Sequence, residues 1–137
     1  MNYHGEKDVV RWYRGKRQRV EDGNEQAIRS VMDEAADYMR YNIMTRGTGW
    51  GEKPEARYET GKMVGQVESQ TNVTERGNVN GRFGWLRDRE DYFRYQEGGF
   101  IHNWTGNLVP GMYALADAQT WAVEELKERI SENLNNA

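Results

Sequence analysis

The sequence contains no cysteine, two prolines and two histidines among its 137 residues. Without cysteine there is no disulfide framework, no thiolate metal site and no cysteine nucleophile. The two histidines, His4 and His102, lie far apart and show none of the spacings that bind zinc on one helix. No apolar run approaches the roughly 18 residues that a membrane-spanning helix needs. We therefore expect no metal, no cofactor and no association with a membrane.

A secretory signal is also not expected, because residues 1–20 contain no apolar block of the length that such signals use. Catalytic arrangements are equally scarce. The segment Gly-Thr-Gly-Trp-Gly-Glu at 47–52 resembles a phosphate loop, but it lacks the Gly-Lys-Ser/Thr ending and follows a predicted helix instead of a strand. The carboxylates at 33–37 and 124–128 fall mostly on the solvent faces of predicted helices. The sequence therefore predicts that the protein is not an enzyme.

Charge is abundant and unevenly distributed. The formal net charge is −3, but residues 1–20 hold six basic and two acidic side chains, and the rest of the chain holds 13 basic and 20 acidic ones. This asymmetry is typical of an interaction tail. We interpret residues 1–20 as a basic N-terminal arm and residues 21–137 as one domain, whose size is common for a single fold. The alternative is a frayed terminus whose charges only improve solubility.

Two long helices are predicted. Asp22 and Glu25 form a variant of the capping box, and apolar residues then recur with helical spacing over 28–43. We expect a helix of about 20 residues over 24–46, ~30 Å long at 1.5 Å per residue. A second helix is expected to begin near Pro110, which suits a first helical turn, and to continue with an acidic face to the C-terminus.

A hairpin is predicted between the helices. The pattern alternates over 67–73, where one face would hold Val67, Ser69, Thr71 and Val73, and again over 79–85, where one face would hold Val79, Gly81, Phe83 and Trp85. Residues 76–78 form a turn signal between the two segments. A short turn or helix is expected at 59–64, and the aromatic segment 91–100 fits either a strand or a short helix. The order predicts an α+β fold in which both long helices cover one face of a small antiparallel sheet. The sheet edges would remain open to another copy.

Three short segments carry a resemblance to a known family. They are Thr-Gly-Lys-Met at 60–63, Tyr-x-x-Tyr-Gln-Glu-Gly at 92–98 and Val-Pro-Gly-Met-Tyr-Ala-Leu at 109–115. Together with the long first helix and the two strands, they resemble the small neck proteins of long-tailed phages, the head–tail joining or tail-completion family. The resemblance extends over residues 22–134 and does not include the basic arm.

This resemblance implies a non-enzymatic virion protein that forms a ring, expected to be a hexamer, around the channel of the genomic DNA. Head connector or adaptor proteins would lie on one side of the ring, and the tail tube or tail terminator on the other. The protein would assemble in the host cytoplasm and end at the head–tail interface. The long loop at 47–59 and the absence of a Gly-Thr pair after Glu97 depart from the family pattern and leave open which neck ring this is.

Aromatic residues outside the periodic segments are the predicted subunit contacts, because interfaces are enriched in aromatic side chains. The alternative for these residues is a satellite cluster beneath the long loop. With the glutamate of the Gly turn, the predicted subunit contacts are Trp50, Tyr58, Tyr92, Tyr95, Glu97 and Trp104.

The basic arm supplies a second set of predicted contacts, which are Arg11, Trp12, Arg14, Lys16, Arg17 and Arg19. We expect them to bind an acidic surface of a neighbouring subunit, and we expect acidic or neutral groups to line the DNA channel. The alternative is a nucleic-acid-binding module, in which the cations contact phosphates and Trp12 stacks on a base. The acidic body of the chain argues against that alternative.

Overall fold

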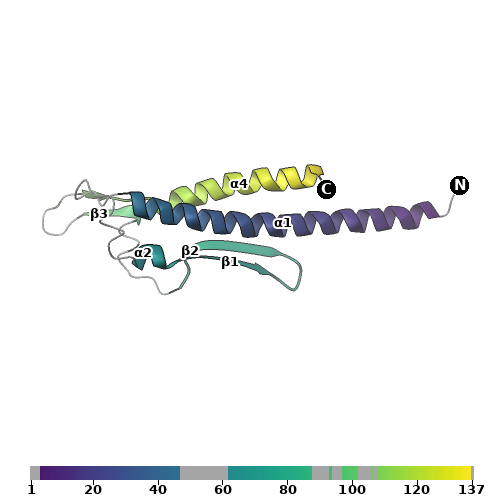
Figure 1. The fold of residues 1–137 in the computed structure, drawn as a ribbon, viewed down its shortest axis with the longest axis horizontal. Helices are drawn as coiled ribbons and strands as arrows, with labels where there is room; N and C mark the ends of the chain where they lie inside the picture. The colour runs from purple at the N-terminus through teal and green to yellow at the C-terminus, as the bar shows by residue number, and fades with distance from the viewer. Residues whose placement is uncertain are drawn as a thin grey trace.

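The structure is a computed structural model that describes residues 4–46, 62–87, 93, 97–101, 106 and 108–136. The elements in chain order are α1 (His4–Thr45), α2 (Lys62–Gly65), β1 (Val67–Val73), β2 (Val79–Trp85), β3 (Gly99–Ile101), β4 (Leu108–Pro110) and α4 (Ala114–Asn136). In Figure 1, α1 lies between α4 and the β1–β2 hairpin, and its N-terminal end projects beyond both. The predicted α+β fold, with a small antiparallel sheet packed against long helices, is confirmed.

The β1–β2 hairpin matches its prediction closely. Val67 pairs with Trp85 at the open end and Val73 pairs with Val79 beside the turn. Gly77 adopts φ 82°, a backbone conformation that glycine tolerates at no steric cost. The backbone N–H of Thr74 donates to the Asn78 carbonyl over 2.8 Å and closes the turn. Strict alternation of side chains was therefore sufficient to predict both the strands and their pairing.

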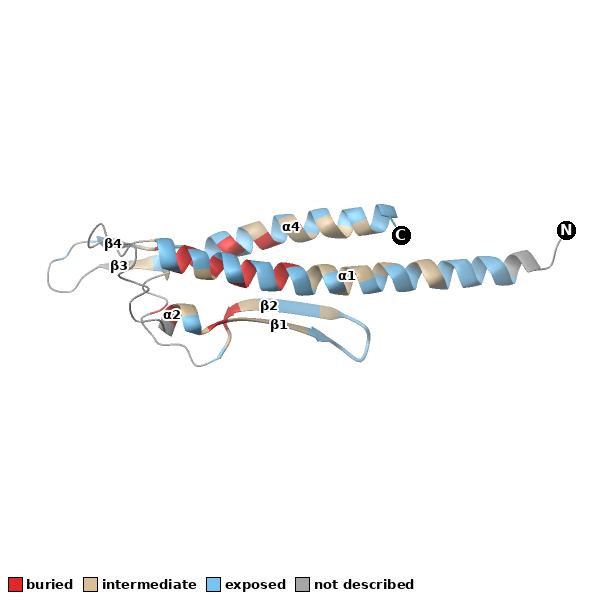
Figure 2. Cartoon of the chain, in the orientation of Figure 1, coloured by how far each residue is buried: buried red, intermediate tan, exposed pale blue. Residues whose placement is uncertain are grey.

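The core lies between the C-terminal half of α1 and the other elements. Figure 2 shows the buried residues of α1 concentrated in that half. Met39 and Ile43 are fully buried there, in agreement with the predicted apolar stripe. Across from them the ring centroids of Trp85 and Phe93 lie 5.0 Å apart. The indole N–H of Trp85 donates to the Met63 carbonyl over 2.9 Å, so this buried polar group is satisfied.

Helix α4 packs antiparallel along α1. At its N-terminal end the buried contacts are small side chains, which allow the two helices to approach closely, namely Ala114, Ala118 and Ala122. At its C-terminal end the contacts are polar. Arg129 donates to Glu34 over 2.6 Å, and Asn133 donates to the Val20 carbonyl over 3.0 Å. The polar contacts fix the register of the pair where apolar packing ends.

Arg129 is the central cation of that polar end. It pairs with Glu34 of α1 and with Glu125, one turn before it on α4. Burial by itself lowers the pKa of the Arg129 guanidinium, but hydrogen bonds and charges from the two carboxylates raise that pKa above its usual value. Arg129 therefore stays charged, and the link between the helices does not depend on pH through this cation.

One prediction about the layers is corrected. Both long helices were expected to cover the same face of the sheet, but α1 alone packs along the hairpin and α4 packs along α1. Helix α4 meets the hairpin within the shared core, where Ala114 and Ala118 belong to the same buried cluster as Val67 and Trp85. The small buried residues of α4, Ala114, Ala118 and Ala122, instead pack along α1.

The predicted start of the first helix is also wrong. Helix α1 begins at His4 and continues through residue 22, so the basic arm, as far as it is described, is the projecting end of α1. Asp22 does not cap the helix, because its carboxylate accepts a hydrogen bond of 2.9 Å from Gln18 inside the helix. Arg17 pairs in the same way with Glu21 over 3.0 Å. Such pairs four residues apart favour helix in the segment before the predicted start.

The predicted start of the second helix is wrong as well. Pro110 lies in β4, where it pairs with Gly99 of β3, and α4 begins only at Ala114. Between them Tyr113 has φ 49°, which interrupts any helix extending back to Pro110. Within the segment that fitted either strand or helix, the backbones of Phe93 and Glu97 are helical and β3 begins at Gly99.

The alanine contact between α1 and α4 yields a first prediction. Ala118→Leu should destabilise the protein by about 1–3 kcal/mol, because a larger side chain at a fully buried position must push the helices apart. Ala116→Leu is the matched control, since Ala116 is exposed on the same helix. Urea unfolding followed by circular dichroism measures both. Equal stability of the two variants would contradict close packing at Ala118.

Candidate subunit interface

The structure describes one of the six predicted subunit contacts. Glu97 lies just before β3, and the other five lie outside the described residues, namely Trp50, Tyr58, Tyr92, Tyr95 and Trp104. All six predicted contacts of the basic arm are described and lie on the first turns of α1. Glu97 lies near the C-terminal end of α1, where it and Arg46 both contact the start of α4, and the contacts of the basic arm lie near the N-terminal end of α1.

Glu97 caps the N-terminus of α4. Its carboxylate accepts hydrogen bonds of 2.9 Å from the backbone N–H groups of Leu115 and Ala116, one on each oxygen. Its backbone carbonyl accepts a third bond, of 3.0 Å, from the N–H of Tyr113. The first N–H groups of a helix lack partners within it, and a negative charge is favoured there by the helix dipole. Glu97 thus supplies the cap that no residue next to α4 provides.

Arg46 holds the same junction from the end of α1. Its guanidinium donates to the Met112 carbonyl and to the Asp117 carboxylate, each over 2.6 Å. One turn earlier, the buried amide of Asn42 donates to the Ala114 carbonyl over 3.3 Å. Hydrogen bonds from α1 and from Glu97 therefore converge on the first turn of α4.

Gly111 makes this convergence possible. A Cβ at this position would collide with the Glu97 carbonyl oxygen and would lie 2.6 Å from the Gly98 carbonyl carbon, and both are backbone atoms. Neither Gly111 nor Arg46 was among the residues predicted from the sequence. A signal was present for Gly111, because the Pro110-Gly111 pair is a turn signal and argues against a helix start at Pro110.

The N-terminal extension of α1, defined here as residues 4–19, forms the second surface. The last turns of α4 contact α1 at Val20 and Asn24, so the extension lies past the end of α4 (Figure 1). Its apolar side chains are well exposed, with Val9 63%, Trp12 59% and Tyr13 61% accessible. A helix of this length is marginal in water when nothing packs against it. The extension is therefore expected to gain support from a partner.

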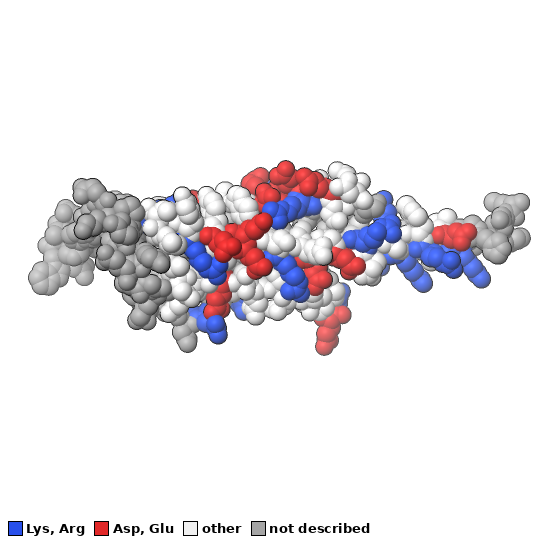
Figure 3. Space-filling model, viewed as in Figure 1, with Lys and Arg blue, Asp and Glu red and all other residues white. Residues whose placement is uncertain are grey.

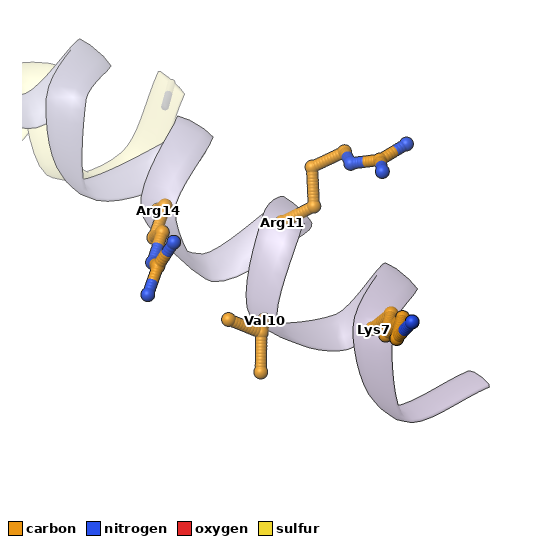
Figure 4. A pocket seen from close by; sticks show the side chains of 4 residues that line it. All are labelled: Lys7, Val10, Arg11 and Arg14. Carbon is orange, nitrogen blue, oxygen red and sulfur yellow. The ribbon is translucent and has the colours of Figure 1, made fainter. Parts of the chain in front are cut away.

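Charges on the extension differ in their pairing. Arg17 is paired with Glu21, and the Lys16 ammonium lies 5.3 Å from the centroid of the Trp12 ring. Within the part of the chain that the structure describes, four cations of the extension have no ion-pair partner, namely Lys7, Arg11, Arg14 and Arg19. Figure 4 shows three of them spreading from the helix around Val10. These are free to bind an anionic surface.

The opposite charge gathers elsewhere on the molecule. Figure 3 shows acidic side chains along α4 and basic ones over the projecting end of α1. Among the described residues, neither β1 nor β2 has a further strand beside it, so each presents an open edge. The molecule thus exposes a basic helix, an acidic helix face and, among the described residues, two open sheet edges, which can pair with another chain.

Other kinds of site were also sought among the described residues. No group of three or more His, Asp or Glu side chains there is arranged to hold a metal ion. None of the helices in that part of the chain is both long and apolar enough to cross a membrane. Comparisons with protein families, with curated proteins and with solved structures find no match to this chain.

The cap yields a second prediction. Glu97→Ala should lower the free energy of unfolding by about 1–2 kcal/mol, because two N–H groups of α4 lose their acceptor. Glu97→Gln should cost less, since one amide oxygen can still accept. Glu128→Ala is the control, because it removes an exposed carboxylate of α4 that caps nothing. Chemical unfolding ranks the variants, and a Glu97→Ala protein as stable as the control would contradict the capping role.

The close approach at Gly111 yields a third prediction. Gly111→Ala should destabilise the fold by about 1–3 kcal/mol, because the new methyl group meets rigid backbone. Gly98→Ala is the matched control, since a Cβ there would meet no atom within 4 Å. Thermal melting of both proteins distinguishes them. A Gly98→Ala variant that melts lower than Gly111→Ala would show that the junction is not packed as described.

Proposed function

We propose that this chain is a structural subunit of a ring at the head–tail interface of a tailed phage, where it joins the head connector to the tail tube around the DNA channel. The observation that carries the proposal is the N-terminal extension, a helix that exposes Val9, Trp12 and Tyr13 and has unpaired cations. A helix that nothing packs against is marginal in water, so a neighbour that packs on the extension would stabilise it.

The resemblance to neck proteins gains support from the junction. Two of the segments that carry it, 92–98 and 109–115, meet where Glu97 binds the start of α4. These short motifs therefore have a structural meaning in this chain, because they specify where the last helix begins and how it is held. In this chain the motifs position a helix and do not position a reacting group. Such a role suits a protein that assembles with other subunits.

The exposed surfaces also favour contacts between copies. Each copy has both a basic helix and an acidic helix face. The basic helix of one copy can therefore bind the acidic face of the next copy. Contacts of this kind close into a ring when the rotation between copies permits it. The open edges of β1 and β2 offer further contact area. DNA would pass through the lumen, lined by acidic or neutral groups that let it slide.

The second candidate is a nucleic-acid-binding module, and one observation favours it. Trp12 is 59% exposed on the same helix as the unpaired Arg11 and Arg14, which is a combination that contacts phosphates and bases. Fluorescence anisotropy with a short DNA duplex tests it. Binding that persists at physiological salt and is lost in Arg11→Glu would favour this candidate over the ring.

A fourth prediction tests the ring by location. A tag fused after the exposed end of α4 and labelled with gold should mark the junction between head and tail in purified particles, because the ring joins the two. Particles assembled with the untagged chain are the control. Quantitative mass spectrometry should give several copies of the chain per particle. A single copy, or label only on heads or on free protein, would contradict the proposed function.

A further inference from the structure

One row of cations on the extension lacks any partner. Lys7, Arg11 and Arg14 are spaced by four and three residues, which places them along one side of the helix over about 10 Å. Val10 lies beside this row, and Figure 4 shows all four side chains extending from α1. No ion pair joins any of the three cations to another described residue. The row is therefore available to bind an anionic surface of another molecule.

A matching row of acids lies on α4. Glu124, Glu128 and Glu132 are spaced by four residues and span about 12 Å of one helix face. Unlike Glu125, which pairs with Arg129, they have no ion-pair partner among the described residues. One turn before Glu124 the half-buried Trp121 ring stacks on Tyr38 with centroids 5.9 Å apart. A guanidinium that extends past Glu124 would find an aromatic face there.

The two rows cannot meet within one molecule. Helix α1 is continuous from His4 to Thr45, and the last turns of α4 already lie beside Val20. The extension therefore points away from its own α4, as Figure 1 shows. Pairing of two extensions with each other is also disfavoured, because residues 1–20 hold six basic side chains against two acidic ones and would repel their copies.

We propose that the extension of one copy docks along the acidic face of α4 in a second copy, with Lys7, Arg11 and Arg14 on the row Glu124, Glu128 and Glu132. The contact deepens the proposed ring and rests on it, since it names the surfaces that join neighbouring subunits. It is heterologous, because a copy that gives its extension still offers its own α4 to the next. A second copy of this chain is the partner that fits the extension, because the two rows have equal numbers of charges, opposite signs and similar lengths.

A charge exchange between two variants of the full chain tests the contact. Variant A carries Lys7→Glu, Arg11→Glu and Arg14→Glu, and variant B carries Glu124→Lys, Glu128→Lys and Glu132→Lys. In sedimentation velocity at low salt, the unaltered chain should associate, and A and B should each remain monomeric. An equimolar mixture of A and B should associate again, because each extension then meets an α4 of opposite charge.

Two further comparisons sharpen the test. Arg11→Glu should weaken self-association at least about fivefold, whereas Arg19→Glu, an equal charge change on another side of the same extension, should have a much smaller effect. Raising the salt from 0.05 to 0.5 M should weaken association of the unaltered chain, because screening shortens the range of exposed charges. Circular dichroism verifies that A and B remain folded.

Several outcomes would overturn the contact. They are an unaltered chain that does not associate at millimolar concentration, a variant B that associates as well as the unaltered chain, and a mixture of A and B that stays monomeric. DNA binding through Arg11 without self-association would assign the extension to nucleic acid instead. These results concern the purified chain, whereas location in particles tests the proposed function, so either can fail without the other.

Discussion

The fold depends on one junction, where three distant parts of the chain determine how α4 begins. The Glu97 carboxylate caps the helix, Arg46 binds the carbonyl of Met112, and Gly111 permits the backbones to touch. A helix whose first turn is held from outside can be placed accurately against its neighbour without a local cap. The small buried residues of α4 then need little adjustment to pack along α1, and the hairpin packs on the surface of α1 that remains.

The antiparallel arrangement set by this junction also determines what is left exposed. Helix α1 has 42 residues and α4 has 23, and their paired ends are joined at Arg46 and Asp117. The surplus length must therefore emerge at the other end, past Asn133. The N-terminal extension is a consequence of matching two unequal helices from one fixed end, and its exposure is independent of what its own side chains prefer.

The sequence predicted the parts of this structure that depend on local order. The alternation over 67–73 and 79–85 predicted the antiparallel hairpin, and the helical spacing over 28–43 predicted the buried face of α1. It failed at the ends of helices. Asp22 is a residue type that often caps helices, but its side chain accepts a hydrogen bond from Gln18 inside α1. Pro110 is favoured in the first turn of a helix, but it lies in the strand β4. The real cap of α4, Glu97, lies 18 residues away from Leu115, beyond the range of any local pattern.

The basic character of the N-terminal arm could be found from the sequence, but the pairing of its individual cations could not. A count of charges was enough to identify residues 1–20 as basic, because it needs no structure. Which cations are free could not be counted, since pairs such as Arg17 with Glu21 exist only once the segment is helical. The role of Glu97 inside the chain could not be predicted either, because the backbone N–H groups that donate to its carboxylate belong to a helix far along the sequence. Its predicted contact with another subunit stays a prediction.

The side-chain contacts that stabilise the extension as a helix are unevenly distributed along it. Its stabilising side-chain contacts lie at residues 12–22, where Lys16 covers Trp12 and two polar pairs span one turn each. Toward its N-terminal end, the described side chains of Lys7 to Arg11 make no such contact. The extension is therefore least supported where its unpaired cations begin. Free energy gained from a partner at that end would stabilise helix and contact together, so binding and helix order are coupled there.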